Sequence, residues 1–218
     1  MTFDPDSPAT SDGLYGLETS PDEARVVVVP VPWEATTSYR RGTRRGPRRL
    51  LEASWQVDLT DLDVGPAWKA GIAMLSPDPR IETWCDEATP DALAVIAQGG
   101  GLPEAAARVD AFSERLNELV RRTVGGILEQ DKIPALIGGD HSSPFGAIQA
   151  AAERHGPIGV LQIDAHADLR VAYEGFTWSH ASIMQNVLER IPEVTRLVQV
   201  GIRDVGAREL AAIERQPE

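Results

Sequence analysis

Two glycines and a histidine follow an apolar run in the middle of the chain. Gly138 and Gly139 come directly after residues 133–137, and Asp140 and His141 come next. Glycine permits tight turns and close backbone approach, and ligands of parallel α/β folds bind at the carboxyl ends of the strands. The pattern favours a turn that presents His141 at a binding edge. A strand-to-helix turn with an incidental histidine is the alternative that this motif alone leaves open.

Carboxylate and imidazole side chains alternate after the next apolar run, where Ala165 and Ala167 separate Asp164, His166 and Asp168. Side chains at i, i+2 and i+4 of an extended chain lie on one face, so the three groups are predicted to converge. Burying them without a partner would be costly, and a metal ion is a suitable partner. This donor set, without a thiolate, favours Mn²⁺ over a structural Zn²⁺. A solvated loop with chance alternation is the alternative.

Another histidine, His180, stands twelve residues beyond Asp168 and precedes a predicted helix. This spacing would let the imidazole swing over the metal site as a proton shuttle. A residue that caps or packs at the helix start is the simpler interpretation from spacing alone.

Six arginines lie within residues 40–49. Such a density suggests a nucleic-acid or phosphate patch. However, Tyr39 is the one aromatic residue beside it, and the net charge of −12 opposes binding to nucleic acids or anionic membranes. An exposed helix start or a salt-bridged subunit interface is the better interpretation.

Composition narrows the class of protein. A chain of 218 residues with 42% hydrophobic residues suits one large domain, predicted over 25–218. Residues 1–24 hold six acidic and no basic residues, which argues against a signal peptide. We interpret this segment as a solvated arm, and packing on a partner subunit is left open. No apolar run approaches the roughly 20 residues that span a bilayer. The single cysteine, Cys85, favours a reducing compartment, so the sequence predicts a cytoplasmic protein.

Strand and helix patterns alternate along the chain. Continuous apolar runs, typical of parallel strands buried on both faces, occupy residues 26–31, 133–137, 158–163 and 197–202. Helical spacing is found over residues 104–130, 145–155, 182–190 and 205–215. This alternation predicts an α/β fold with a mostly parallel sheet. Residues 60–103 have weak periodicity and several Pro and Gly residues, and are predicted to be mostly loop, with short elements that cannot be placed.

Together the motifs resemble the ureohydrolase (arginase/agmatinase) family, and its agmatinase-type branch in particular. Residues 138–142 and 164–168 are similar to the family's first and second metal motifs. Further similarity lies in residues 30–33, 38–47 through 53–54, 169–170, 173–175, 179–181 and 199–203. The resemblance covers roughly residues 25–210. It implies a three-layer α/β/α arginase-like fold and a homo-oligomer, either a trimer or a hexamer.

The resemblance also implies a role for each matching position. His141 and Asp168 would bind one Mn²⁺, His166 would bind a second, and Asp164 would bridge the two. Asp140 would orient the turn from behind the ligands, and His180 would deliver a proton to the departing amine. In such two-metal sites a water attacks an electrophilic centre, here the guanidinium carbon of a small cationic substrate.

The preferred substrate is agmatine, which would give putrescine and urea; guanidinobutyrate, arginine and formimidoylglutamate are the alternatives. Arg170 is near enough in sequence to meet a substrate carboxylate, but no substrate-binding residue is assigned. The family's third metal motif, Ser-x-Asp-x-Asp, does not occur in these 218 residues. We therefore expect a domain that is incomplete at its C-terminus and lacks central strands, or a catalytically inactive fragment.

Overall fold

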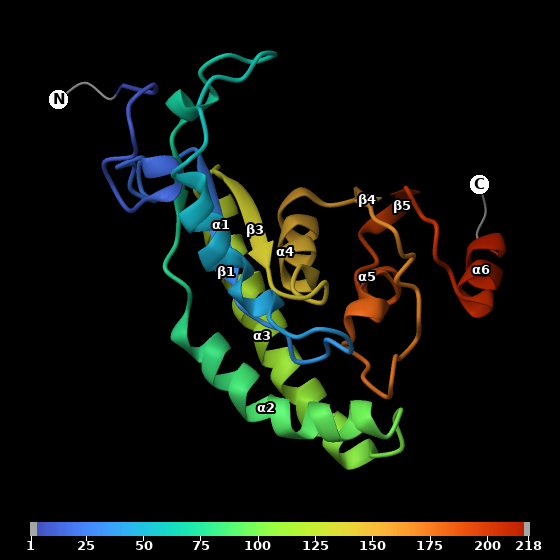
Figure 1. Cartoon of the computed structure of the whole chain (residues 1–218). Helices are drawn as coiled ribbons and strands as arrows, with labels where there is room; N and C mark the ends of the chain where they lie inside the picture. The colour runs from blue at the N-terminus through green and yellow to red at the C-terminus, as the bar shows by residue number, and fades with distance from the viewer. Residues whose placement is uncertain (1–3, 216–218) are drawn as a thin grey trace.

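In the computed structural model, which describes residues 4–215, strands and helices alternate from β1 onwards, except that α3 follows α2 directly (Figure 1). The strands are β1 (Val26–Val31), β2 (Ile72–Met74), β3 (Ile133–Gly138), β4 (Ile158–Ile163) and β5 (Val194–Val200). The helices are α1 (Gly46–Ser54), α2 (Pro79–Ala97), α3 (Pro103–Glu129), α4 (Phe145–His155), α5 (Ile183–Arg190) and α6 (Ala207–Glu214). Short 3₁₀ segments occupy Leu14–Gly16, Thr43–Arg45, Ala67–Ala70 and His180–Ser182.

Most predicted elements are confirmed, and β1, β4 and α4 have the predicted bounds. The prediction of a mostly loop segment over residues 60–103 is wrong, because β2 and α2 lie there. Asp78 begins α2 by accepting a hydrogen bond from the backbone N–H of Arg80 at 2.9 Å. Pro90, which suggested a break, lies on the exposed side of the helix. The buried side carries mostly small or weakly apolar residues: Ile81, Cys85, Ala88, Ala92 and Val95.

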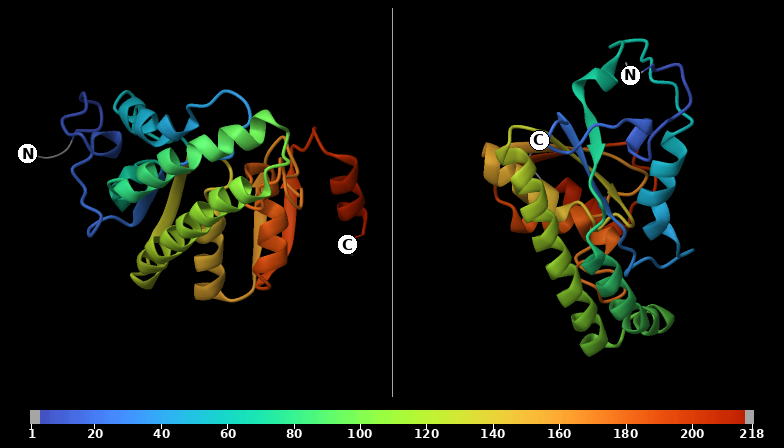
Figure 2. Two further views of the ribbon diagram at one scale, coloured as in Figure 1. Left: turned by 90° about the horizontal axis from the view of Figure 1, so that it is seen from below. Right: turned by 90° about the vertical axis from the view of Figure 1, so that its left-hand side faces the viewer.

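The strands form two parallel sheets, of order β2-β1-β3 and β4-β5. Helices α1 and α3 lie on opposite sides of the first sheet, and α2 packs on α3 (Figure 2). Helices α4 and α5 pack on one face of the second sheet. The α/β fold with parallel sheets is therefore confirmed. Within the described residues β3 and β4 do not pair, so one edge of each strand is open.

The β4–β5 sheet is covered on one face alone, whereas its continuous apolar runs predicted burial on both faces. Val160 pairs with Leu197 on the covered face, whereas the pairs Leu161–Val198 and Ile163–Val200 face outward. The outward residues are mostly exposed: Leu161 (63%), Ile163 (77%), Val198 (46%) and Val200 (50%). Their alternating exposure follows from the two-residue period of a strand, since no helix of the described chain covers this face.

We expect the 218-residue chain to self-associate when it is produced alone, because unpaired strand edges and an exposed apolar face both favour aggregation. Size-exclusion chromatography with light scattering would measure this. The double change Leu161→Lys, Val198→Lys should reduce the association, whereas Val171→Lys, at an exposed apolar residue outside the sheet, should not. A monodisperse unmodified chain with a sharp thermal transition would contradict the expectation.

The acidic N-terminal segment is in part packed on its own chain, which corrects the prediction of a solvated arm. Leu14 and Leu17 are buried. The indole Nε1 of Trp55 donates to the Gly13 carbonyl at 3.0 Å, and Lys132 Nζ donates to the Pro21 carbonyl at 2.7 Å. Among the described residues, no helix has the length and apolar character needed to cross a membrane.

Candidate metal centre

The turn after β3 rests directly on the chain that follows β1. The backbone N–H of Gly139 donates to the Val31 carbonyl at 2.9 Å, and that of Asp140 donates to the Trp33 carbonyl at 2.8 Å. A Cβ atom at Gly139 would lie 1.7 Å from the Trp33 carbonyl oxygen. The close backbone approach predicted for the two glycines is thus present, and it places His141 beyond the carboxyl end of β3.

His141 meets two carboxylates from the loop after β4. Its Nδ1 lies 2.6 Å from Asp168 Oδ2 and 3.2 Å from Asp164 Oδ2. One ligand atom from each of the three residues falls within 4.8 Å of the others, a grouping that could hold a metal ion. The Asp168 side chain is 8% exposed and that of Asp164 is 22% exposed. The structure therefore brings together three of the four predicted metal ligands.

The loop that carries the two aspartates is held by hydrogen bonds of its own. Asp164 accepts from the Gln162 side chain at 3.2 Å and from the His166 backbone N–H at 3.0 Å. Asp168 has a φ of +53°, in the left-handed region where aspartate is among the better tolerated residues. Its carbonyl accepts from the backbone N–H groups of Met184 and Gln185, in the first turn of α5. The start of α5 thus helps to fix the Asp168 side chain.

His166 does not join this cluster, so the predicted convergence of Asp164, His166 and Asp168 on one point is wrong. The His166 side chain is 60% exposed, with Nδ1 3.7 Å from Asp164 Oδ1 and Nε2 3.7 Å from Asp204 Oδ2. The prediction assumed that residues 164–168 continue as an extended strand. In the structure β4 ends at Ile163 and Asp168 has a left-handed backbone, so the side chains at i, i+2 and i+4 no longer lie on one face. His166 instead lies on the outer side of Asp164, and Asp204 beside it was not predicted.

Burial and local charge act in opposite directions on the cluster. Burial by itself lowers the pKa of His141, but the hydrogen bond to Asp168 and the nearby carboxylates outweigh it and raise the pKa. Burial likewise raises the pKa of Asp164, yet donors from His166 and Gln162 outweigh it and leave that pKa lowered. The surroundings therefore favour the charged forms of His141 and Asp164.

Asp140 and His180 lie on either side of an unpredicted residue, Thr36, which follows β1. Asp140 is buried, which raises the pKa of its carboxyl, and it accepts from the Ser142 backbone N–H at 3.0 Å. Thr36 Oγ1 donates to Asp140 Oδ2 at 3.4 Å and lies 3.4 Å from His180 Nδ1. The capping role considered for His180 belongs to Ser179, whose hydroxyl accepts from the Ala181 backbone N–H at 3.2 Å. The carboxyl-edge rule could have pointed to Thr36, since it follows a parallel strand.

The arginine cluster is paired in part within the chain. Arg44 pairs with Asp86 at 2.6 Å, and Arg48 and Arg49 both pair with Glu52. Arg41 lies 3.5 Å from Glu34. Three carboxylates thus pair with four of the six arginines, and these pairs fit the interpretation as a helix start, because the cluster leads into α1.

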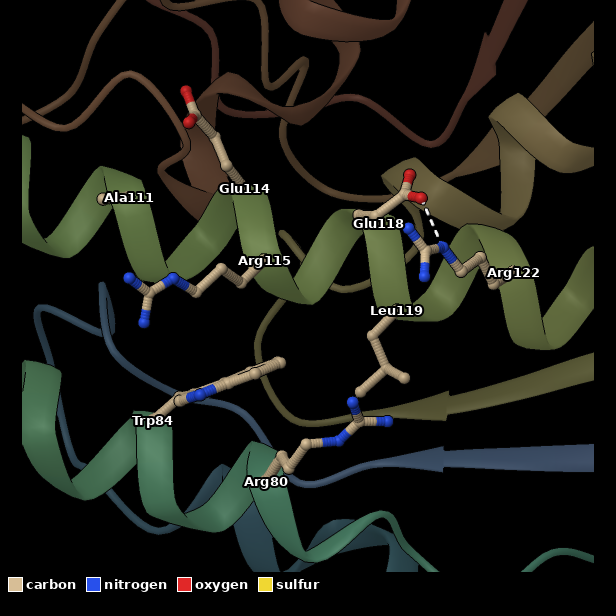
Figure 3. A pocket seen from close by; sticks show the side chains of 8 residues that line it. All are labelled: Arg80, Trp84, Ala111, Glu114, Arg115, Glu118, Leu119 and Arg122. Atoms are coloured by element: carbon tan, nitrogen blue, oxygen red, sulfur yellow. Dashed lines mark hydrogen bonds and ion pairs between the residues drawn. The ribbon is translucent and has the colours of Figure 1, made fainter.

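A separate cleft of about 510 Å³ lies between α2 and α3. Figure 3 shows Trp84 and Leu119 on its walls and Arg122 paired with Glu118. The Arg80 guanidinium lies over the Trp84 ring, 5.9 Å from its centroid. It contains none of the predicted site residues, so the candidate centre remains the His141 cluster.

Comparison with known proteins identifies the family. The model of the Arginase family matches residues 24–217, which is nearly the whole chain. The chain belongs to the arginase family.

Relatives within the arginase family include two named N(1)-aminopropylagmatine ureohydrolase. The protein from Synechocystis sp. is 34% identical over 177 residues, which cover 78% of this chain and 49% of the relative. The protein from Thermus thermophilus is 34% identical over 193 residues, which cover 87% of this chain and 55% of the relative. This arginase-family chain thus spans about half the length of these curated relatives.

A solved structure agrees on the fold. The agmatine ureohydrolase of Thermoplasma volcanium aligns with a TM-score of 0.66 and 24% identity, covering 99% of this chain and 59% of that one. At this identity the likeness supports the arginase-like fold and nothing finer. The predicted family and fold class are both confirmed.

Proposed function

We propose that this chain carries part of the catalytic site of a metal-dependent guanidino hydrolase, which releases urea and an amine. The observation that carries the proposal is the His141–Asp164–Asp168 cluster at the carboxyl ends of parallel strands in an arginase-family fold. Neither half of this observation would suffice alone, because exposed acidic groups often occur without a metal and a fold hosts many functions.

The cluster fits a divalent cation such as Mn²⁺ on the chemistry of its donors. Two carboxylates and an imidazole, with no thiolate, suit a hard or borderline ion. A short hydrogen bond now joins His141 and Asp168, and the excess negative charge favours a cation among these atoms. In the proposal His141 and Asp168 hold one ion, His166 holds a second, and Asp164 lies between them. When bound, the metal supplies a water-derived nucleophile at neutral pH.

Two further residues would orient the metal-binding turn and protonate the leaving amine. Asp140 anchors the turn that carries His141, because its carboxyl accepts hydrogen bonds from Ser142, the residue after His141. His180 would deliver a proton to the amine that leaves the guanidinium carbon, since an amine is a poor leaving group without one. Its place beside the cluster-bearing turn, through Thr36, supports this role.

The substrate would be a small cationic guanidino compound. Agmatine remains the proposed substrate. N(1)-aminopropylagmatine is a second one, because the two relatives described above are named N(1)-aminopropylagmatine ureohydrolase. The net charge of −12 favours the approach of such cations. The homo-oligomer, trimer or hexamer, rests on the family resemblance, and a cytoplasmic location rests on the single, buried Cys85.

We expect the Mn²⁺-loaded protein to release urea from agmatine or N(1)-aminopropylagmatine, and chelation to abolish the release. A urease-coupled ammonia assay on the longest chain that contains these residues would measure this, with guanidinobutyrate and arginine in parallel. If protein shown to contain metal releases urea from none of these compounds, the proposed activity is wrong.

A catalytically inactive chain is the second candidate for the 218 residues alone. It is favoured by the coverage of about half of each relative (49% and 55%) and by the open edges of β3 and β4. A cooperative thermal transition together with tight Mn²⁺ binding by the 218-residue chain would argue against it.

A further inference from the structure

Thr36 joins two groups that lie far from it and from each other in the sequence. Its side chain is completely buried. Its hydroxyl oxygen lies 3.4 Å from Asp140 Oδ2 and 3.4 Å from His180 Nδ1, and it accepts from the His180 backbone N–H at 3.2 Å. One hydroxyl carries one hydrogen, so it can donate to the carboxylate or to the imidazole, but not to both.

The surroundings of Asp140 decide which acceptor receives that hydrogen. Asp140 Oδ1 accepts from both the backbone N–H and the hydroxyl of Ser142. Among the described residues, Thr36 provides the side-chain donor that reaches Oδ2. If the hydroxyl turned to His180 instead, the buried Asp140 carboxyl would keep the backbone hydrogen bond from Thr36 but would lose the side-chain donor at Oδ2, and a buried carboxylate is costly to leave short of donors. The hydroxyl therefore donates to Asp140.

With its hydrogen given to Asp140, the Thr36 oxygen offers His180 a lone pair. Nδ1 of His180 must then carry a hydrogen in order to bond to it. In the neutral imidazole this leaves the lone pair on Nε2, which has no hydrogen-bond partner in the described part of the chain. A proton shuttle needs such a free basic nitrogen, which accepts a proton and then releases it.

We infer that Thr36 is a positioning residue that holds neutral His180 as its Nδ1–H tautomer and leaves Nε2 as the nitrogen that exchanges protons. The inference rests on the role proposed for His180, but it concerns a property of the folded chain that exists without metal or substrate. Asp140 acts as the anchor that orients the Thr36 hydroxyl, and the proton on Nδ1 stays in place throughout.

The test reads the tautomer directly. Long-range ¹H–¹⁵N correlation spectra of the metal-free protein, produced as the longest chain that contains these residues and labelled with ¹⁵N-histidine, distinguish a protonated from an unprotonated ring nitrogen. The chain has 4 histidines, and His180→Gln assigns the relevant signals. Above the titration range of the imidazole, we expect Nδ1 of His180 to be protonated and Nε2 to be unprotonated.

Three variants isolate the hydroxyl of Thr36. Thr36→Val, of the same shape, should lower the ratio of Nδ1–H to Nε2–H tautomer by roughly 5-fold, the worth of one hydrogen bond. Thr36→Ser should keep the ratio. Thr37→Val is the matched control, because the Thr37 hydroxyl is buried and makes no hydrogen bond. Should Thr36→Val fail to fold, Thr36→Ala replaces it.

Two results would overturn the inference: an Nε2–H tautomer in the unmodified chain, or an unchanged ratio in folded Thr36→Val. Neither result bears on urea release, and an absence of urea release would leave the tautomer measurement intact. The two proposals can therefore fail separately.

Discussion

Asp168→Asn is expected to weaken Mn²⁺ binding by on the order of 100-fold or more, because even residues that merely support a ligand contribute about 10–100-fold. Asparagine keeps the shape of the side chain and tolerates the left-handed φ of +53° at this position. The change therefore removes the charge with little strain. Equilibrium dialysis with elemental analysis of the bound metal would measure the affinity.

His141→Ala should have an effect of the same size, since it removes the imidazole that faces both carboxylates. Asp168→Ala should do the same, with added backbone strain. The matched control is His155→Ala, at an exposed residue at the end of α4, which should leave binding unchanged. Near-normal Mn²⁺ affinity after the His141 or the Asp168 changes, in folded protein, would refute their assignment as ligands.

His180→Asn is expected to lower the turnover of a guanidino substrate by about 10²–10⁴-fold, the usual worth of a positioned general acid. The reason is that the leaving amine needs a proton at the moment the C–N bond breaks. Metal content should stay unchanged, because His180 reaches the site through Thr36 and lies outside the His141 cluster. Steady-state rates and metal analysis on one sample of the longest available chain would measure both quantities.

Two other outcomes would each contradict this role for His180. A loss of stability of about 1 kcal/mol with normal turnover would indicate a cap at the helix start, a function that the structure gives to Ser179. Loss of a metal ion would make His180 a ligand. His155→Asn provides the control for replacing an imidazole by an amide elsewhere on the surface.

The local features of the site could be predicted because each depends on neighbouring residues. Apolar runs marked β1, β3 and β4, since continuous apolar residues are typical of parallel strands. The glycines after β3 predicted a close backbone approach, and the Trp33 carbonyl leaves no room for a Cβ atom at Gly139. By contrast, α2 was not predicted, because three of its five buried residues are Cys or Ala, which give a weak apolar period, and because Pro90 lies within the helix.

The sequence by itself determined which side chains stand at the carboxyl ends of the strands, because strand period and turn chemistry are local properties. Only the tertiary structure decided which of them meet. Asp168 reaches His141 through a left-handed turn that sequence period cannot show, and the same turn leaves His166 outside the cluster. Thr36 contacts residues 104 and 144 positions away. Such contacts depend on how the loops after β1, β3 and β4 pack together, and no local pattern records that packing.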